Sequence, residues 1–305
     1  MEKCGICGEL NSKPYYGNDR RLLQCKKCGV VFLAQDFRIS DLNKYYGDGN
    51  ILESRYKYLK GFAFVNKKNA QDIKKIILKY IKPAGKKLLD VGANTGFFVA
   101  EAVEAGFDAI GIEPNKFAVG YASRNNIPVK EASVHNFSFD YKFDVITILS
   151  VLEHLEKPAE VLEKLNSYLV DGGILVVEVP NIESYASRKR RFNWKYIVSE
   201  HIFHFSPKTL SRVLENNGFK IISVRQSDYY TEMGVRECLK RIFGINPEKE
   251  PQIDRFKSKS ECLENTTIVT ERSFPKELVR KTLLFLVKLL GREEFIVIIA
   301  QKLSH

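Results

Sequence analysis

The chain has 305 residues, a length that accommodates two domains of about 150 residues each or one large domain with an appendage. Apolar residues make up 44% and charged residues 28%, a balance that excludes a wholly disordered, collagen-like or fibrous chain. The net charge of +11 is concentrated in residues 1–85, whereas residues 86–226 carry no net charge. This distribution argues against a nucleic-acid substrate, because proteins that bind a long polyanion surround their active face with positive charge.

The sequence predicts a cytoplasmic location. No uninterrupted apolar run approaches the roughly 20 residues that a membrane-spanning helix needs. The first residues, Met1-Glu2-Lys3-Cys4, lack the apolar stretch of a secretory signal. We therefore expect a cytoplasmic, enzyme-sized protein in which closely spaced cysteines bind metal rather than form disulfides.

Two close cysteine pairs lie at the start of the chain, within residues 1–35. Cys4-x2-Cys7 and Cys25-x2-Cys28 match the C-x2-C…C-x2-C spacing of zinc sites. Four thiolates leave no open coordination position, so the zinc would be structural and residues 1–35 would form a zinc-ribbon-like motif. An iron site of the same geometry and four buried thiols without metal remain as alternatives.

The periodicity of apolar residues changes near residue 86. Residues 36–85 are predicted to form a helical linker or lid, and residues 86–226 alternate short apolar strands with helices. Such alternation predicts an α/β fold in which a parallel sheet is covered by helices on both faces. Strands are expected at 86–91, 108–112, from 129, 144–149, 174–179, 219–224 and 295–300, and helices at 96–105, 115–124, 158–169 and 207–217.

A second stretch, residues 227–293, interrupts this alternation. It contains a polar, charged segment and a helix predicted over residues 275–290, and we interpret it as a helical insertion that caps the substrate side. The core is then assembled from residues 86–226 and 294–305. The 275–290 helix could contact a membrane surface, although packing against the core is the more common role for such a helix.

A glycine-rich turn follows the first predicted core strand and opens a helix, where a ligand can approach the backbone at a helix N-terminus. A dinucleotide site would require G-x-G-x-x-G, but Asn94 and Phe97 occupy the second and third glycine positions. Spaced as Asp90-x-Gly92-x-Asn94-x-Gly96, the turn instead resembles motif I of the class I S-adenosylmethionine-dependent methyltransferases.

Further segments resemble the same family in the expected order. Glu113 ends the second strand before Pro114, where the family has an acid that accepts the two ribose hydroxyls. Residues 143–155 and 169–178 are similar to the family's fourth and fifth strands, and the last predicted strand resembles its terminal antiparallel strand. The resemblance implies a Rossmann-like seven-stranded fold and S-adenosyl-L-methionine as cofactor, bound by Asp90, Gly92, Asn94, Gly96, Phe97, Glu113, Pro114, Ser133 and Ser150.

The cysteine-rich head joined to this core resembles bacterial methyltransferases of sugar and polysaccharide pathways, including nucleotide-sugar C-methyltransferases. The segment from Ser199 to Ser206 is similar to their Glu-His segment, in which the two residues lie over the substrate as acid–base groups. Those enzymes carry Tyr-His before the Glu-His, whereas this chain has Val198-Ser199. This departure leaves O-methylation of a sugar or similar hydroxyl as open as C-methylation.

Histidine is the residue type best suited to remove the acceptor's proton, because its pKa lies near neutrality. His201 beside Glu200 is the predicted general base, and His154, just after the fourth strand, is predicted to face the substrate. For His201 and Glu200 the alternative is a role in capping the next helix or packing the sheet edge. For His154 the alternative is a hydrogen-bonded anchor of its loop.

We therefore expect a methyltransferase whose partner is a small, sugar-like acceptor and not a nucleic acid. An RNA methyltransferase with a zinc-binding head is the main alternative. Against it stand the neutral core and the sequence Leu149-Ser150-Val151-Leu152, in place of the Asn/Asp-Pro-Pro-aromatic turn of many amino-group methyltransferases. A third alternative is a binding module that holds the cofactor without turnover.

Overall fold

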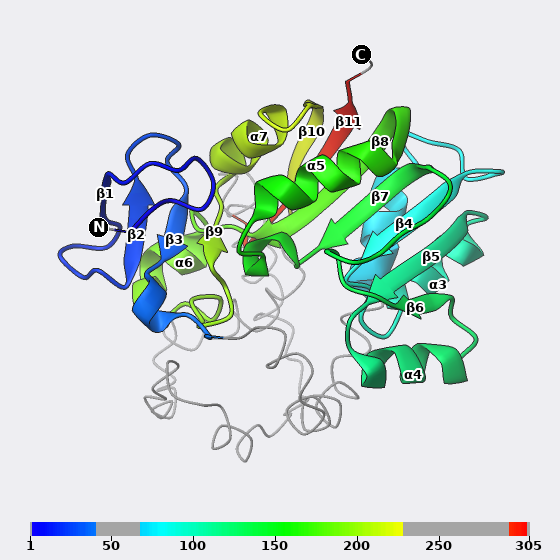
Figure 1. Ribbon diagram of the computed structural model, residues 1–305, viewed down its shortest axis with the longest axis horizontal. Coiled ribbons are helices and arrows are strands. Elements are labelled where there is room, and N and C mark those ends of the chain that lie inside the picture. The colour runs from blue at the N-terminus through cyan, green and yellow to red at the C-terminus, as the bar shows by residue number, and fades with distance from the viewer. Residues whose placement is uncertain (1, 41–67, 228–292, 304–305) are drawn as a thin grey trace, which may run out of the picture.

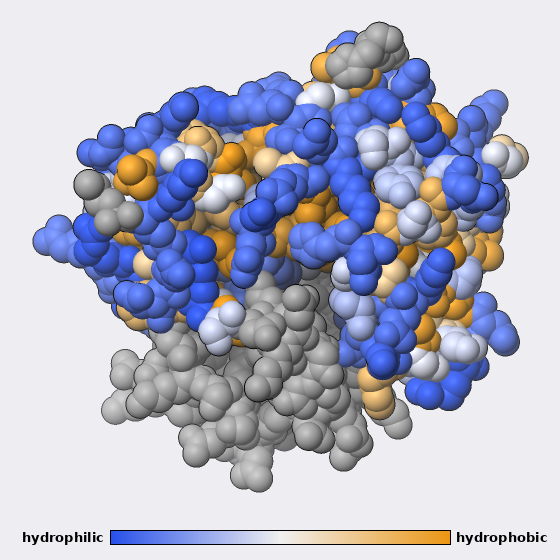
Figure 2. Space-filling model, viewed as in Figure 1, coloured by the Kyte–Doolittle hydropathy of each residue, from blue (hydrophilic) through white to orange (hydrophobic). Residues whose placement is uncertain are grey.

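The computed structural model describes residues 2–40, 68–227 and 293–303 (Figure 1). The predicted 275–290 helix, nearly all of the predicted 227–293 insertion and much of the 36–85 linker lie outside these ranges. Of the linker, residues 68–77 form a helix, as the apolar spacing predicts. Every helix of the described part is too short or too polar to span a bilayer. On the face in Figure 2, hydrophilic side chains dominate and apolar ones gather in small patches.

A seven-stranded mixed sheet forms the centre of the molecule, as predicted. Its order is β10-β11-β8-β7-β4-β5-β6, in which β11 is antiparallel to both of its neighbours and the strands from β8 to β6 are parallel. The strands are β4 (Lys87–Val91), β5 (Asp108–Glu113), β6 (Val129–Glu131), β7 (Phe143–Leu149), β8 (Leu169–Pro180), β10 (Phe219–Ser227) and β11 (Phe295–Lys302).

Helices cover both faces of this sheet because its buried strands are apolar on both sides. In β4, Leu88 packs in one apolar cluster with α3, whereas Leu89 packs in another with α5 and α7. Figure 1 shows α5 and α7 on the same face of the sheet. The helices are α3 (Phe97–Glu104), α4 (Lys116–Arg124), α5 (Pro158–Tyr168) and α7 (Pro207–Glu215).

The strand order reverses direction at β4, which lies between β5 and β7. The chain leaves β4 towards β5 on one side, and later returns to place β7 on the other side. In open α/β sheets, ligands bind at the carboxyl ends of the strands at such a switch point. The loops after β4 and β7 are therefore the expected walls of the functional site.

The N-terminal head forms a smaller antiparallel sheet that recruits a strand from the core. Its order is β1-β2-β3-β9, and β9 (Phe203–His204) comes from the segment that follows β8. The Leu33 amide also donates to the Ile202 carbonyl at 2.9 Å. The head thus shares a sheet with the segment that carries His201. Its own strands are β1 (Ser12–Pro14), β2 (Leu22–Cys25) and β3 (Val31–Leu33), followed by the 3-10 helix η1 (Gln35–Phe37).

Apolar packing strengthens this junction between head and core. Trp194 is fully buried in a cluster with Leu22, Leu33 and Ile197. The basic run 188–191 lies beside this cluster, at the end of helix α6 (Tyr185–Arg190) and in the short 3-10 helix η3 (Arg191–Asn193). The sequence did not predict α6, η3 or the pairing of β9.

One detail of the sheet differs from the sequence prediction. The strand expected at residues 174–179 begins earlier, because β8 starts at Leu169 and runs through Gly172 and Gly173. The pairing of β7 with β8 shifts register between Phe143 and Val145, opposite this region. A Cβ on Gly173 would lie 2.8 Å from the Val170 carbonyl oxygen, so the local kink needs glycine and the strand continues through it.

Candidate functional site

The loop after β4 is held in a conformation that only glycine adopts freely. Gly92 and Gly96 have φ angles of +75° and +81°, and the amides of Gly92 and Ala93 both donate to the Ile112 carbonyl of β5. A Cβ on Gly92 would lie 2.4 Å from Cγ2 of Val151, in the loop after β7. The loops after β4 and β7 therefore touch, and α3 begins directly after Gly96 with its N-terminus at this edge.

Glu113 at the end of β5 faces this loop. Its two carboxylate oxygens accept the backbone amides of Asn94 and Asn115, both at 2.9 Å. Burial raises the pKa of Glu113, and the two amide hydrogen bonds oppose the rise. Each oxygen keeps a second lone pair, so the carboxylate can still accept a pair of ligand hydroxyls. The structure thus brings together Asn94 and Glu113, which the sequence analysis predicts as cofactor-binding residues.

Asp90 lies at the base of the loop but inside the sheet. Its side chain is only 3% exposed and accepts a hydrogen bond from the Thr147 hydroxyl of β7 at 2.6 Å. Burial raises the pKa of Asp90 to about 7, although the Thr147 hydrogen bond lowers it. Sequence reasoning missed Thr147, since its contact with Asp90 depends on the register of β4 against β7.

The raised pKa of Asp90 predicts a pH-dependent stability. Between about pH 4 and pH 7 the folded chain binds more protons at this group than the unfolded chain, so the free energy of unfolding falls as the pH rises. The Asp90→Asn variant has no titrating group at this position, so it lacks this fall in the free energy of unfolding. Measured by urea unfolding without cofactor, its stability relative to the wild type should increase from pH 4 to pH 8. The exposed Asp140→Asn control should show no such trend, and a parallel trend in both variants would contradict the assignment.

The remaining predicted cofactor residues lie around the same edge. Ser150 is exposed at the end of β7 with a φ of +55°, and its amide donates to the Glu178 carbonyl. Phe97 is half-buried at the start of α3, and Pro114 is exposed after β5. Ser133 is half-buried after β6, where its amide and hydroxyl both donate to Asn136. Their contacts with a cofactor remain predictions.

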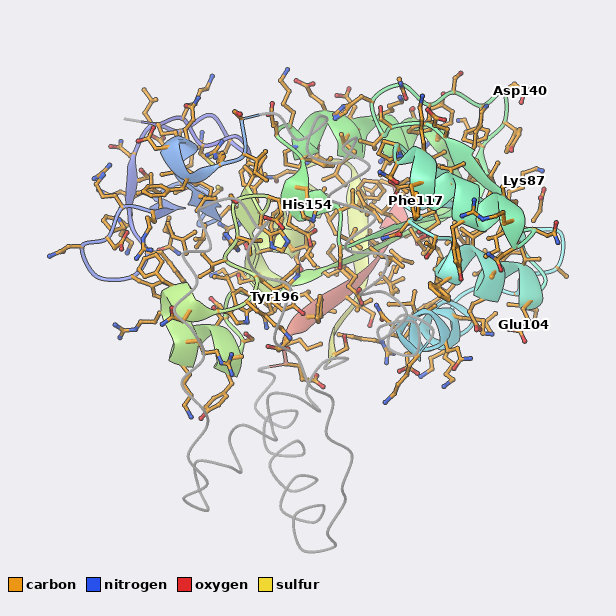
Figure 3. The ribbon with its side chains drawn as sticks, turned by 90° about the horizontal axis from the view of Figure 1, so that it is seen from below. Lys87, Glu104, Phe117, Asp140, His154 and Tyr196 are labelled. Carbon is orange, nitrogen blue, oxygen red and sulfur yellow. The ribbon has the colours of Figure 1, made fainter. Side chains whose placement is uncertain are left out.

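The three predicted acid–base residues come together beside the β7 loop. His154 ends the 3-10 helix η2 (Leu152–His154), and its Nδ1 lies 2.9 Å from the Glu200 carbonyl oxygen. The rings of His154 and His201 meet edge to face, with their centroids 4.6 Å apart. Tyr196 stacks parallel to His201. Figure 3 shows His154 and Tyr196 towards the middle of the molecule and Asp140 at its margin.

Glu153 belongs to this cluster, although sequence reasoning passed over it. Its side chain is 1% exposed, and both carboxylate oxygens lack a hydrogen-bond partner among the described residues. Burial, together with the nearby charge of Glu178, raises the pKa of Glu153 to about 8. Its position directly before His154 was visible in the sequence, but only the fold shows that this loop residue is buried.

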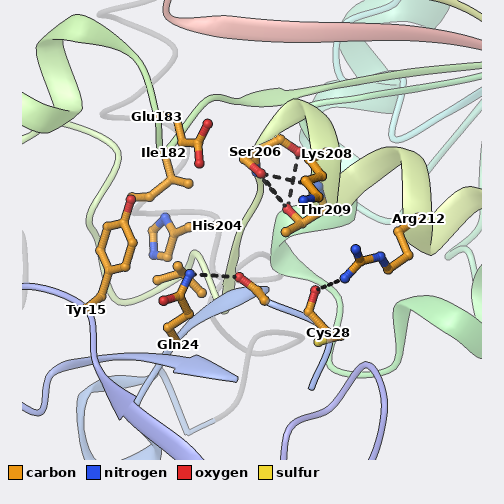
Figure 4. A pocket seen from close by; sticks show the side chains of 12 residues that line it. Tyr15, Gln24, Cys28, Ile182, Glu183, His204, Ser206, Lys208, Thr209 and Arg212 are labelled. Atoms are coloured by element: carbon orange, nitrogen blue, oxygen red, sulfur yellow. Dashed lines mark hydrogen bonds between the residues drawn. The ribbon is translucent and has the colours of Figure 1, made fainter. Parts of the chain in front are cut away.

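His204 lies near the cluster but lines a different cavity. This cavity, about 210 Å³, lies between the head and α7, and Figure 4 shows His204 there with Tyr15, Gln24 and Arg212. None of the predicted cofactor residues lines it. Burial lowers the pKa of His204 to about 3, so its imidazole is neutral at physiological pH. This placement agrees with a structural rather than a catalytic histidine.

The four head cysteines form one cluster. The Sγ atoms of Cys4 and Cys28 are 3.7 Å apart, those of Cys7 and Cys25 are 3.5 Å apart, and all four lie within 4.8 Å of one another. Four sulfurs around a tetrahedral zinc ion with Zn–S bonds of about 2.3 Å would be about 3.8 Å apart. A hydrogen bond with Cys28 lowers the pKa of Cys4, and the same contact together with burial raises the pKa of Cys28, so one thiolate is shared by this pair.

Comparison with known proteins agrees with the fold and with a methyltransferase. The family described as "Methyltransferase domain" matches residues 63–224. The ubiquinone biosynthesis O-methyltransferase of Rickettsia typhi is 27% identical over 142 residues, which cover 45% of this chain and 56% of the relative. The tRNA U34 carboxymethyltransferase of Idiomarina loihiensis is 29% identical over 153 residues, 46% of this chain and 47% of the relative. The chain thus spans about half the length of these relatives.

Solved structures share the fold over most of the chain. A SAM-dependent methyltransferase from Archaeoglobus fulgidus superposes with a TM-score of 0.52 at 20% identity, over 81% of this chain and 99% of that structure. A SAM-dependent methyltransferase from Thermotoga maritima gives a TM-score of 0.52 at 17% identity, over 82% of this chain and 97% of that structure. Because the family model matches more than half of the residues of this chain, the chain belongs to the methyltransferase domain family and is a class I S-adenosylmethionine-dependent methyltransferase.

Proposed function

We propose that this chain transfers the methyl group of S-adenosylmethionine to a hydroxyl group of a small molecule, namely a sugar or a nucleotide-linked sugar. The observation that carries the proposal is the cluster of half-buried His154 with buried His201 and Glu200 beside the cofactor loop. A hydroxyl needs to lose its proton as it attacks the methyl carbon, and a positioned imidazole can accept that proton.

The adjacency of two loops supports such a transfer. Methyl transfer is an in-line displacement, so the acceptor has to be held against the sulfonium methyl group. The touching loops of Gly92 and Val151 place the cofactor loop directly beside the loop that carries His154. His201, which is 8% exposed, meets the His154 ring edge to face next to this loop. The wider relatives also include an O-methyltransferase.

A tRNA substrate is the second candidate function. It is favoured by the similarity to the tRNA U34 carboxymethyltransferase and disfavoured by the absence of net charge in residues 86–226. The basic run 188–191 lies against the head, where Arg21 stacks on Phe192 with its guanidinium 4.1 Å from the ring centroid.

The identity of the acceptor class can be tested with labelled cofactor. The purified chain is incubated with methyl-labelled S-adenosylmethionine and a cell extract that is then divided into small-molecule, lipid and RNA fractions. We expect label in nucleotide sugars or in a glycolipid, and treatment with alkali and glycosidases should leave an O-methyl sugar. Label in RNA would replace the sugar proposal with the tRNA alternative. The Gly92→Ala variant, which is expected not to bind the cofactor, measures the background incorporation of label.

We further propose that the four head cysteines bind one structural zinc ion, which stabilises the position of His201 through the pairing of β3 with β9. The Cys25→Ser variant should lose zinc and unfold at a temperature lower by on the order of 10 °C, since a shift of about 2–4 °C accompanies each kcal/mol lost. Elemental analysis and calorimetry measure both quantities. Cys262→Ser should keep the zinc, and a Cys25→Ser chain with full zinc content would refute the site.

A further inference from the structure

A second group of metal-ligand side chains lies apart from the cysteines. Glu153, His154 and His201 each offer one ligand atom, and these atoms all lie within 4.8 Å of one another. Two ligands on opposite sides of one ion are about 4.2 Å apart when each bond is about 2.1 Å long. Small side-chain rotations are therefore sufficient to bring the three ligand atoms around a single cation.

Glu153 is the residue that most requires a cation. Its carboxylate is buried, and no described residue donates a hydrogen bond to either oxygen. A buried carboxylate without partners is unfavourable, and proteins normally supply it with a counter-charge or a bound metal. Among the described residues, no lysine or arginine forms an ion pair with it. The neighbouring ligands are two imidazoles, which bind metals in their neutral form.

His154 has the hydrogen bond expected of a metal-binding histidine. Its Nδ1 faces the Glu200 carbonyl oxygen at 2.9 Å. A carbonyl oxygen only accepts, so Nδ1 carries the proton and Nε2 keeps its lone pair. Histidine ligands in metal sites usually donate their other ring N–H to a carbonyl or carboxylate in this way. The Tyr196 ring lies parallel to that of His201, with 8° between the planes and 6.2 Å between the centroids.

We propose that Glu153, His154 and His201 bind one divalent first-row transition metal ion, such as Mn²⁺, Fe²⁺ or Zn²⁺, at the acceptor end of the active site. Two imidazoles and one carboxylate suit these ions, whereas Mg²⁺ and Ca²⁺ prefer oxygen ligands throughout. Three protein ligands leave coordination positions open, as in catalytic rather than structural sites.

The role of this ion rests on the proposed function. An acceptor hydroxyl that binds at an open position becomes more acidic, and its proton passes to water. The resulting alkoxide oxygen forms a bond to the methyl carbon while the carbon–sulfur bond breaks. The electron pair of that bond stays on sulfur, which leaves S-adenosylhomocysteine. His201 then acts as a metal ligand, and the cation supplies the activation that a free imidazole would otherwise provide.

The site can be tested with Mn²⁺ alone, because manganese prefers oxygen and nitrogen ligands and does not compete for the cysteine cluster. The full chain, containing one zinc ion, is titrated with MnCl₂ and followed by electron paramagnetic resonance and calorimetry. We expect one Mn²⁺ per chain. Glu153→Gln, which keeps the shape of the side chain, should weaken Mn²⁺ binding at least about 10-fold, whereas the exposed Glu156→Gln control should not.

S-adenosylmethionine binding by each variant shows that the fold is intact. Absence of Mn²⁺ binding, or equal binding by Glu153→Gln and Glu156→Gln, would overturn the proposed site. Full methyl transfer by a chain depleted of all metal except the head zinc would also overturn it, while leaving the proposed function in place. If Mn²⁺ binds as expected but label never reaches a hydroxyl, the metal site stands and the proposed function fails.

Discussion

Replacing Gly92 with alanine will abolish the binding of S-adenosylmethionine. The residue has a φ of +75°, which costs an L-residue about 1–2 kcal/mol, and its new Cβ would lie 2.4 Å from Cγ2 of Val151. Either the loop after β4 or the loop after β7 has to move to relieve this collision. A shift of the loop after β4 would also displace the start of α3 and the contact of that loop with the Glu113 carboxylate. We expect the dissociation constant, measured by calorimetry, to rise at least about 100-fold, which corresponds to about 2.7 kcal/mol.

Gly85 supplies a matched control for this variant. Its φ of +71° is nearly the same as that of Gly92, but a Cβ there meets no heavy atom within 4 Å. Gly85→Ala therefore introduces the same backbone strain without the collision. It should bind the cofactor as tightly as the wild type. Tight binding by Gly92→Ala would show that the loop after β4 is not the cofactor site.

Replacing His201 with alanine should lower the turnover number by about 10²-fold or more while cofactor binding stays intact. The imidazole meets the His154 ring edge to face and is not one of the residues predicted to bind the cofactor, so its loss should affect the acceptor and not the cofactor. Single-turnover transfer from labelled S-adenosylmethionine, with the acceptor found in the fractionation experiment, gives the rate directly. Calorimetry gives the cofactor affinity of the same preparation.

The exposed His135→Ala variant controls for the general loss of a histidine. A second substitution, His201→Gln, keeps a polar side chain of similar length and guards against collapse of the cluster. Wild-type turnover in both His201 variants would exclude this residue from the reaction. A loss of cofactor binding equal to the loss of turnover would instead assign His201 a structural role.

The sequence was sufficient to predict the sheet and the cofactor loop because both follow from local patterns. Alternating apolar strands and helices give the parallel order, and the glycines at positions 92 and 96 mark a turn that other residues rarely adopt. Glu113 could be placed because it directly ends a strand. The comparison with known methyltransferases confirms the class that these patterns indicate.

The parts that escaped prediction depend on distant residues. β9 contains only two residues, too few for a periodic signal, and it forms because Phe32 and Val31 present a free strand edge. The hydrogen bond between Thr147 and Asp90 needs the register of two strands and joins residues that are 57 positions apart in the chain. In the sequence Glu153 is indistinguishable from an exposed acidic loop residue. Only the fold shows that it is buried and that no described residue forms a hydrogen bond with its carboxylate.

The position of β11 has a consequence for how the protein is made. This strand pairs with both β8 and β10, and its residues from Val297 to Ala300 are fully buried. During synthesis β8 and β10 leave the ribosome first, and residues 228–292 follow before β11 emerges. Until then the two strands present unpaired backbone edges, which are the surfaces that promote aggregation. Expression yield should therefore depend on chaperones that shield these edges while the remaining chain is translated.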